Sequence, residues 1–173
     1  MEMIIKTKKF ILRPFKKSDV YSLQKNINDK AVVKYTMRIP YPYKLKHATE
    51  WVQKNINMQK KKIKTSICWA IDNNDEIIGV ISLESIEKHK AELGYWLAKR
   101  YWNKGFMSQA VGIVTKIGLN KLKLIRIYAP VHINNKASCK VLKKNGYKLE
   151  GHLIKNGFKN NSCFDTFIFA KTR

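Results

Sequence analysis

The sequence predicts a single domain of the α/β or α+β class, built on a mixed sheet. Its 173 residues, 45% of them hydrophobic, are enough to form one buried core. Segments of strand-like and helical periodicity follow one another as strand, two helices, three strands, helix, strand, helix and further strands. The strand–helix–strand run at residues 90–132 predicts a right-handed parallel crossover. No linker-like stretch or repeat divides the chain, so we expect one domain over residues 1–173.

The first half of the chain predicts two helices and a hairpin after an initial strand. The expected elements are a strand at residues 7–15, helices at 18–27 and 47–58, a loop at 38–45 and a β-hairpin at 66–72 and 77–85. Phe10 and Leu12 alternate with other residues in the first strand, and Pro14 closes it. Ser18 is placed to cap the first helix.

The second half predicts an alternation of strands and helices. The expected elements are strands at residues 90–98 and 124–132, a helix after Gly105, a helix at 134–144 and closing strands at 147–154 and 162–170. An asparagine caps the helix at 134–144, and Gly146 ends it. Gly94 lies inside a strand, where glycine indicates a bulge or a close backbone approach.

The net charge of +23 indicates an anionic partner or a compositional bias. Nucleic acid, the ribosome, an anionic membrane and an anionic cofactor are the partners that such charge attracts. The cations are nearly all lysines in a chain rich in Ile and Asn, which an AT-rich coding sequence would also produce. Both interpretations remain open, because charge this diffuse does not define a binding surface.

The N-terminus and the cysteines favour a cytoplasmic protein. Residues 1–15 contain no long apolar segment with a cleavage site, and no stretch of the chain approaches the roughly 18 apolar residues of a membrane span. Cys68, Cys139 and Cys163 are odd in number and widely spaced. This pattern argues against a disulfide framework or a zinc site, so we expect reduced thiols and no metal.

Three cations surround the glycine at which the helix after residue 105 begins. Lys99, Arg100 and Lys104 add positive charge to a helix start that already carries unpaired N–H groups and a positive dipole end. A bound anion would offset this charge, and phosphate is the usual ligand there. The P-loop and dinucleotide-binding glycine patterns are both absent. The stretch therefore predicts a nucleotide-containing cofactor other than NAD or a P-loop ligand.

Two stretches resemble the GCN5-related N-acetyltransferase (GNAT) family: AELGYWLAKRYWNKGFMSQAV at 91–111 and INNKASCKVLKKNGYKLEG at 133–151. The subgroup that the chain most resembles contains the ribosomal-protein N-terminal alanine acetyltransferases (RimJ/RimL-like) and their relatives that modify small molecules. The resemblance covers nearly the whole chain. It implies the GNAT fold: a mixed central sheet of about six or seven strands, helices on both faces, and a V-shaped splay between two parallel strands.

The resemblance also implies acetyl-CoA as cofactor. The family's [RQ]-x-x-G-x-[GA] loop, which holds the pyrophosphate on helix-start amides, reads here from Arg100 to Gly105, with Asn103 in place of the first glycine. Asparagine tolerates the left-handed φ that this position requires. The backbone of Trp96, Leu97 and Ala98 would pair with the pantetheine arm. By resemblance the cofactor-binding residues are Trp96, Leu97, Ala98, Arg100, Asn103, Lys104, Gly105, Phe106, Met107, Ser108 and Asn135.

The catalytic candidates are Ser138 and Glu92. Many family members protonate the thiolate with a tyrosine seven residues after the helix-start asparagine, but that position is Leu142 here. Ser138 lies on the same helical face as Asn135, and the ribosomal-protein subgroup has its proposed acid at this place; a first-turn serine is also a common capping residue. Glu92 is the favoured base, Glu84 is second, and deprotonation through water is an alternative.

These residues predict transfer of an acetyl group from acetyl-CoA to a primary amine by direct attack in a ternary complex. A protein N-terminus, such as that of a ribosomal protein, suits a positive surface that rRNA would attract. The alternatives are a small-molecule amine (a polyamine or an antibiotic), or a degenerate acetyl-CoA-binding or basic nucleic-acid-associated protein without turnover. We expect possible ribosome or RNA association by charge, no membrane, and a monomer or homodimer.

Overall fold

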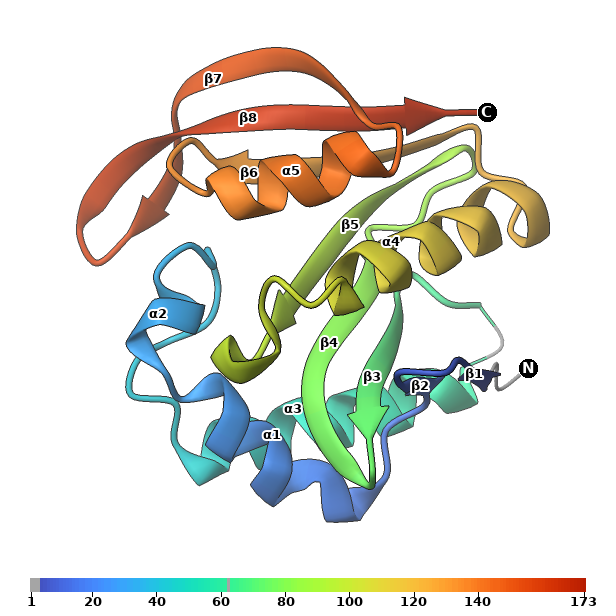
Figure 1. Cartoon of the computed structure of the whole chain (residues 1–173), viewed down its shortest axis with the longest axis vertical. Helices are drawn as coiled ribbons and strands as arrows, with labels where there is room; N and C mark the ends of the chain where they lie inside the picture. The colour runs from blue at the N-terminus through green and yellow to red at the C-terminus, as the bar shows by residue number, and fades with distance from the viewer. Residues whose placement is uncertain (1–3, 62) are drawn as a thin grey trace.

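The computed structural model describes residues 4–61 and 63–173, in which the strands form one eight-stranded sheet (Figure 1). The strands are β1 Ile5–Lys6, β2 Ile11–Arg13, β3 Ile67–Asn73, β4 Glu76–Glu84, β5 Lys90–Leu97, β6 Arg126–His132, β7 Lys148–Lys159 and β8 Ser162–Thr172. Their order is β1-β2-β3-β4-β5-β6-β8-β7, with β5 and β6 parallel and the other neighbours antiparallel. The mixed α/β fold is confirmed, with eight strands in place of six or seven.

Helices cover both faces of the sheet, as predicted. They are α1 Val20–Ile27, α2 Lys30–Val33, α3 Leu45–Lys60, α4 Phe106–Lys116 and α5 Lys136–Lys144. Apolar residues of α1 and α3 pack with Val80 and Trp96 on one face. Apolar residues of α4 and α5 pack with Leu93 and Leu97 on the opposite face (Figure 1). Successive residues of β5 therefore contribute to two separate cores, which is the pattern of a strand buried on both sides.

The predicted strand at 7–15 is wrong in its extent. The Thr7 hydroxyl oxygen accepts the N–H groups of Lys9 and Phe10, at 3.1 and 3.0 Å, and closes a turn between β1 and β2. A threonine side chain that bonds nearby backbone in this way competes with a continuous ladder. The first segment therefore supplies two short strands, which accounts for the additional strand in the sheet.

The predicted cap at Ser18 is also wrong. Ser18 lies within a 3-10 turn, Lys17–Asp19, that precedes α1. The Asp19 carboxylate accepts the Lys16 N–H at 2.8 Å, and both of its oxygens accept from the Arg13 guanidinium. Arg13 also pairs with Asp72 of β3, so two buried carboxylates share one guanidinium beneath α1.

The remaining predicted elements are confirmed in type and place. Asn74 and Asp75 have φ angles of 52° and 61° and connect β3 to β4 in the two-residue hairpin form. The short helix α2 was not expected, because four residues are too few to show a helical period; its signal is Asp29, which accepts the Ala31 N–H. No helix within the described ranges is long and apolar enough to cross a membrane. Residues 1–3 of the N-terminal segment used for the cytoplasmic prediction lie outside those ranges.

Candidate active site

The sheet opens between β5 and β6, which confirms the predicted V-shaped splay. The two strands pair only over three rungs, of which Glu92↔Tyr128 is the last. Beyond it β5 continues along β4, and β6 continues along β8. The bulge considered at Gly94 is absent, because β4 and β5 keep one register from Glu84↔Glu92 to Gly79↔Leu97. The close approach is present instead: a Cβ at Gly94 would lie 3.2 Å from Ser82 Oγ and 3.4 Å from Glu84 Oε1.

The backbone before α4 adopts the conformation that the loop motif predicts. Asn103 has a φ of 60° and Gly105 a φ of 79°, so the asparagine takes the left-handed region as expected. The first helical hydrogen bond runs from the Gln109 N–H to the Gly105 carbonyl. The N–H groups of Phe106, Met107 and Ser108 precede it and have no acceptor within the helix. No side chain of the described residues caps this helix start. These groups are free to bind an anion.

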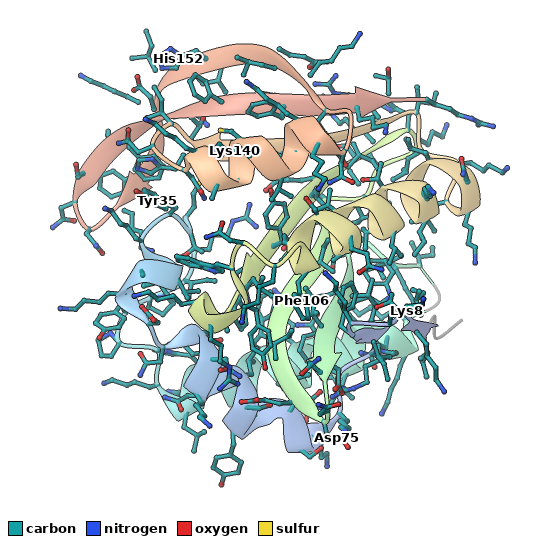
Figure 2. All side chains as sticks on the ribbon, viewed as in Figure 1. Lys8, Tyr35, Asp75, Phe106, Lys140 and His152 are labelled. Carbon is teal, nitrogen blue, oxygen red and sulfur yellow. The ribbon has the colours of Figure 1, made fainter. Side chains whose placement is uncertain are left out.

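Lys9 brings a cation to this helix start that sequence reasoning missed. Lys9 comes from the turn between β1 and β2, 95 residues away from Lys104, whose carbonyl accepts its ammonium at 2.8 Å. Its Nζ lies 5.6 Å from the centre of the ring of Phe106 and 3.6 Å from the place of a Cβ at Gly105. Figure 2 labels Phe106 at the start of α4. Arg100, by contrast, is paired with Glu76 and lies over the Tyr101 ring. The local positive charge therefore comes from Lys9 more than from Arg100.

A groove continues from this helix start along α4 and the end of α5. The first hollow, about 340 Å³, is lined by Lys9, Gly105, Ser108, Gln109, Lys144 and Asn145. A second hollow of about 410 Å³ shares Lys144 and Asn145 and adds Lys116 and Lys171. The Asn145 amide donates to the Ser108 carbonyl at 3.1 Å and holds the two helices together. The groove is therefore lined by lysines and begins at the free amides, which suits a ligand with more than one phosphate.

The main chain of β5 faces the opening at alternate residues. The Ala98 N–H donates to the Ile78 carbonyl at 2.8 Å, so Ala98 is turned toward β4. Backbone groups of an antiparallel strand alternate in direction, which turns Trp96 toward β4 and Leu97 and Tyr95 toward the opening. The Leu97 carbonyl already accepts the Trp102 indole N–H at 2.7 Å. Of the three residues expected to meet an extended ligand, Leu97 thus has the backbone that faces it.

The hydroxyl of Ser138 lies on the α4/α5 side of the sheet. The Asn135 side chain accepts the Ser138 N–H at 3.1 Å, which confirms Asn135 as the cap of α5. Ser138 Oγ is 2.7 Å from the hydroxyl of Tyr95 on β5. Burial raises the pKa of Tyr95, so the phenol keeps its proton. Sequence reasoning missed Tyr95: its alternation marks it only as facing the same side as Leu93 and Leu97.

Glu92 lies on the other face, beside Glu84. The two residues are directly opposite each other on β5 and β4. Burial raises the pKa of Glu92, the Glu84 charge adds to this effect, and Arg38 opposes it. An Arg38 nitrogen lies 2.8 Å from Glu84 Oε2, and another lies 3.6 Å from Glu92 Oε1. A carboxylate at the last rung before the opening is placed to accept a proton from a group that enters between the strands.

Aromatic side chains border this second face. His132, at the end of β6, stacks on Phe164 of β8 at 4.5 Å between ring centres and lies 5.1 Å from the ring of Tyr35, a residue that Figure 2 labels. Its Nδ1 accepts the Asn134 N–H, and burial lowers the pKa of the imidazole. His132 therefore packs between the aromatic rings of Tyr35 and Phe164. Among the described residues, no three His, Cys, Asp or Glu side chains gather as metal ligands would.

The arrangement defines a class of protein by its geometry: an uncapped helix start lies beside an opened sheet, with a hydroxyl pair on one face of the opening and a carboxylate on the other. A family model described as an acetyltransferase (GNAT) domain matches residues 9–148. The chain belongs to this GNAT acetyltransferase family. It is an N-acetyltransferase, with acetyl-CoA as the acetyl donor. The family predicted from the two motif stretches is thereby confirmed.

Curated relatives include enzymes with different acceptors. The N-acetyltransferase YoaA of Bacillus subtilis is 29% identical over 171 residues, which cover 96% of this chain and 95% of that protein. The ribosomal-protein-serine acetyltransferase of Escherichia coli is 34% identical over 103 residues, 58% of each chain. The spermidine N(1)-acetyltransferase of Escherichia coli is 23% identical over 151 residues, 86% of this chain and 78% of that one.

Solved structures share the fold at low identity. RimL, a ribosomal L7/L12 alpha-N-protein acetyltransferase in complex with coenzyme A, superposes with a TM-score of 0.87 at 24% identity, over 98% of both chains. The microcin C7 self-immunity acetyltransferase MccE, in complex with acetyl-CoA and AMP, has a TM-score of 0.86 at 20% identity, over 96% of this chain and 94% of that one.

Proposed function

We propose that the chain acetylates a primary amine by direct attack in a ternary complex, with a protein N-terminus as the leading acceptor. The observation that carries this proposal is the end of the β5–β6 pairing at Glu92↔Tyr128. It leaves Glu92 on one face of the opening and the Tyr95–Ser138 pair on the other. Two reactants that enter from opposite faces would meet between these groups.

The residues around α4 fit the donor. The free N–H groups of Phe106, Met107 and Ser108 would hold the pyrophosphate, and Lys9 and Lys144 would neutralise phosphate charge. The cradle depends on Gly105, because a Cβ there would project into the hollow beside Lys9. Tyr95 and Leu97 present backbone to a pantetheine arm. The predicted contacts of Asn103, Lys104, Arg100 and Asn135 stand as part of this proposal.

The chemistry is then divided between the two faces. Bound acetyl-CoA supplies an acetyl thioester. Glu92 takes a proton from the acceptor ammonium, directly or through a water, which frees the lone pair of the nitrogen for attack. The carbon–nitrogen bond forms and the carbon–sulfur bond breaks; Ser138 gives the departing thiolate its proton, and the second proton that the nitrogen loses restores the Ser138 hydroxyl. The Tyr95 hydroxyl, 2.7 Å from Ser138 Oγ, orients that serine.

The acceptor is inferred from charge and from relatives. A net charge of +23 would bring the chain to an anionic assembly such as the ribosome, and one relative acts on a ribosomal protein. A polyamine is the second candidate, since Glu84 and Glu92 form a local anionic pair and another relative acts on spermidine. A cytoplasmic location and association with the ribosome belong to this proposal.

Calorimetric titration of acetyl-CoA, followed by an acceptor screen, tests the proposal. Desulfo- and dephospho-analogues and ATP at matched salt are the controls. Micromolar binding that needs the pantetheine arm, and turnover of seryl or alanyl peptide amides above spermidine, would support it. Binding no tighter than that of ATP, lost with it as salt rises, would refute the site, because only charge attraction would then be present. Spermidine turnover alone would refute the acceptor.

A further inference from the structure

We propose that Arg38 is a resident counter-ion of the acceptor site, which the acceptor ammonium must displace from Glu92 and Glu84. This inference rests on the proposed function, because it concerns the same face of the opening. It makes Arg38 a specificity-determining residue: an acceptor enters only if its own positive charge replaces that of the guanidinium. A neutral group of the same shape would leave two carboxylates facing each other without a cation.

The two carboxylates require a cation. Glu84 and Glu92 are directly opposite on adjacent strands, and like charges in that relation destabilise a sheet. Both are mostly buried, with 26% and 18% of their side chains exposed. Within the described residues, Arg38 is the one cation that forms an ion pair with either of them. Its guanidinium therefore occupies the position that an incoming ammonium would need.

Glu84 is fixed, whereas Arg38 is free to leave. Ser82 Oγ donates to Glu84 Oε1 at 2.8 Å, and Gly94 leaves the space over β5 that this carboxylate uses. The Arg38 side chain is 71% exposed to solvent. Its separation from Glu92, 3.6 Å, exceeds hydrogen-bond length. The contact of Arg38 with Glu92 is thus weaker than its contact with Glu84. Breaking it costs little free energy, because the guanidinium is already exposed to solvent.

The chain on either side of Arg38 is anchored. The Lys159 ammonium of β7 donates to the Thr36 carbonyl at 2.6 Å and to the Val33 carbonyl at 2.7 Å. The Tyr43 N–H donates to Asn28 Oδ1 at 2.8 Å. Residues 37–42 between these anchors form no helix or strand. The guanidinium can therefore swing toward solvent while its segment stays in place.

Two other titratable groups near Glu84 and Glu92 are neutral and do not supply a cation in place of Arg38. Tyr128 of β6 faces Glu92, and burial together with the Glu92 charge raises the pKa of its hydroxyl, which stays neutral. Cys68 of β3 lies beside Glu84, and burial raises the pKa of that thiol. The charge of Lys54 on α3 opposes this rise in the pKa of Cys68. Displacement of Arg38 is thus an exchange of one cation for another.

Displacement of Arg38 by the acceptor ammonium predicts a kinetic pattern that differs from the pattern of a catalytic or a merely structural arginine. If the acceptor displaces Arg38, then Arg38→Gln should lower the KM of a cationic acceptor roughly two- to fivefold, the worth of one exposed ion pair. The kcat at saturation should not change, because the guanidinium has already left the ternary complex. The acidic limb of kcat/KM should move to higher pH, since the free variant lacks the cation, while that of kcat stays in place.

The experiment compares Arg38→Gln with Arg126→Gln, which removes an arginine from a pair with Glu150 outside the site. Seryl tripeptide amide and spermidine are the acceptors. A KM decrease at constant kcat, seen only in Arg38→Gln, is expected. A fall in kcat, an unchanged KM or the same change in both variants would overturn the proposal.

A second measurement does not depend on turnover. The Arg38 Nε–H signal is followed by NMR in the acetyl-CoA-loaded protein, with n-propylammonium chloride or the same concentration of potassium chloride. Movement to the position of a free arginine with the ammonium alone is expected. Equal movement with both salts, or none, would overturn the displacement. If this test succeeds and neither acceptor is acetylated, the proposed acceptor is wrong and the role of Arg38 stands.

Discussion

Removing the Ser138 hydroxyl is the most direct test of how the donor face works. The Tyr95 hydroxyl lies 2.7 Å from Ser138 Oγ, between β5 and α5, and also donates to the Ser138 carbonyl at 3.5 Å. If Ser138 is the acid, Ser138→Ala should lower kcat by roughly 10²–10⁴-fold, the usual worth of general acid–base catalysis. If Tyr95 orients it, Tyr95→Phe loses about 0.5–1.5 kcal/mol, or roughly two- to twelvefold in kcat. The double variant should then be no slower than Ser138→Ala, because the two hydroxyls act as one unit.

The assay is release of the CoA thiol at saturating acceptor, with acetyl-CoA affinity measured separately by calorimetry. Tyr147→Phe is the matched control, because Tyr147 is also buried and its hydroxyl lies 2.8 Å from Thr115 Oγ1 and not from Ser138. A wild-type kcat in Ser138→Ala would remove Ser138 as the acid. Equal losses in Tyr95→Phe and Tyr147→Phe would mean that the effect is structural, and additive losses in the double variant would mean that the hydroxyls act separately.

Three further outcomes follow from the geometry. Gly105→Glu should abolish acetyl-CoA binding in calorimetry while circular dichroism stays unchanged, since it puts an anion and a strained φ of 79° at the phosphate cradle; unchanged affinity would contradict the cradle. Arg13→Met should lower the free energy of unfolding in urea by about 3–5 kcal/mol, because it leaves Asp19 and Asp72 buried without their cation; a loss below about 1 kcal/mol would contradict this. The kcat/KM should fall on acidification at a pH above the ordinary glutamate range, because burial and Glu84 raise the pKa of Glu92 and protonation removes the base; the same limb in Glu92→Gln would assign it to another group.

Local features of the site were predictable because they depend on a few adjacent residues. Gly105 and Asn103 take left-handed φ for reasons of backbone sterics, and Asn135 caps α5 through a bond to a residue three positions on. The splay followed from the family resemblance, which two motif stretches carried. The predicted cap at Ser18 failed because its neighbour Asp19 organises this turn. The Asp19 carboxylate accepts hydrogen bonds from the guanidinium of Arg13 on β2.

The residues that sequence reasoning missed are brought to the site by long-range packing. Lys9 reaches the Lys104 carbonyl before α4 across 95 positions, Tyr95 meets Ser138 across 43, and Arg38 meets Glu84 across 46. No periodicity in the chain specifies such pairs, because each depends on the register of the whole sheet and on where a turn or loop crosses its edge. Exposed lysines and arginines are especially hard to assign in a chain with 35 of them.

The tyrosine that the resemblance expects on α5 is absent, but a tyrosine on β5 brings a phenol to the same face of the sheet. The resemblance expects a phenol at position 142, where Leu142 is fully buried in the core instead. Tyr95 brings a phenol to the same face of the sheet from β5, and it meets α5 one turn after its cap, at Ser138. A hydroxyl on β5 at Tyr95 still lies beside the opening, because the pairing of β5 with β6 ends at Glu92. The donor face therefore carries a hydroxyl pair although the usual tyrosine is absent, which is why we propose Ser138 as the acid.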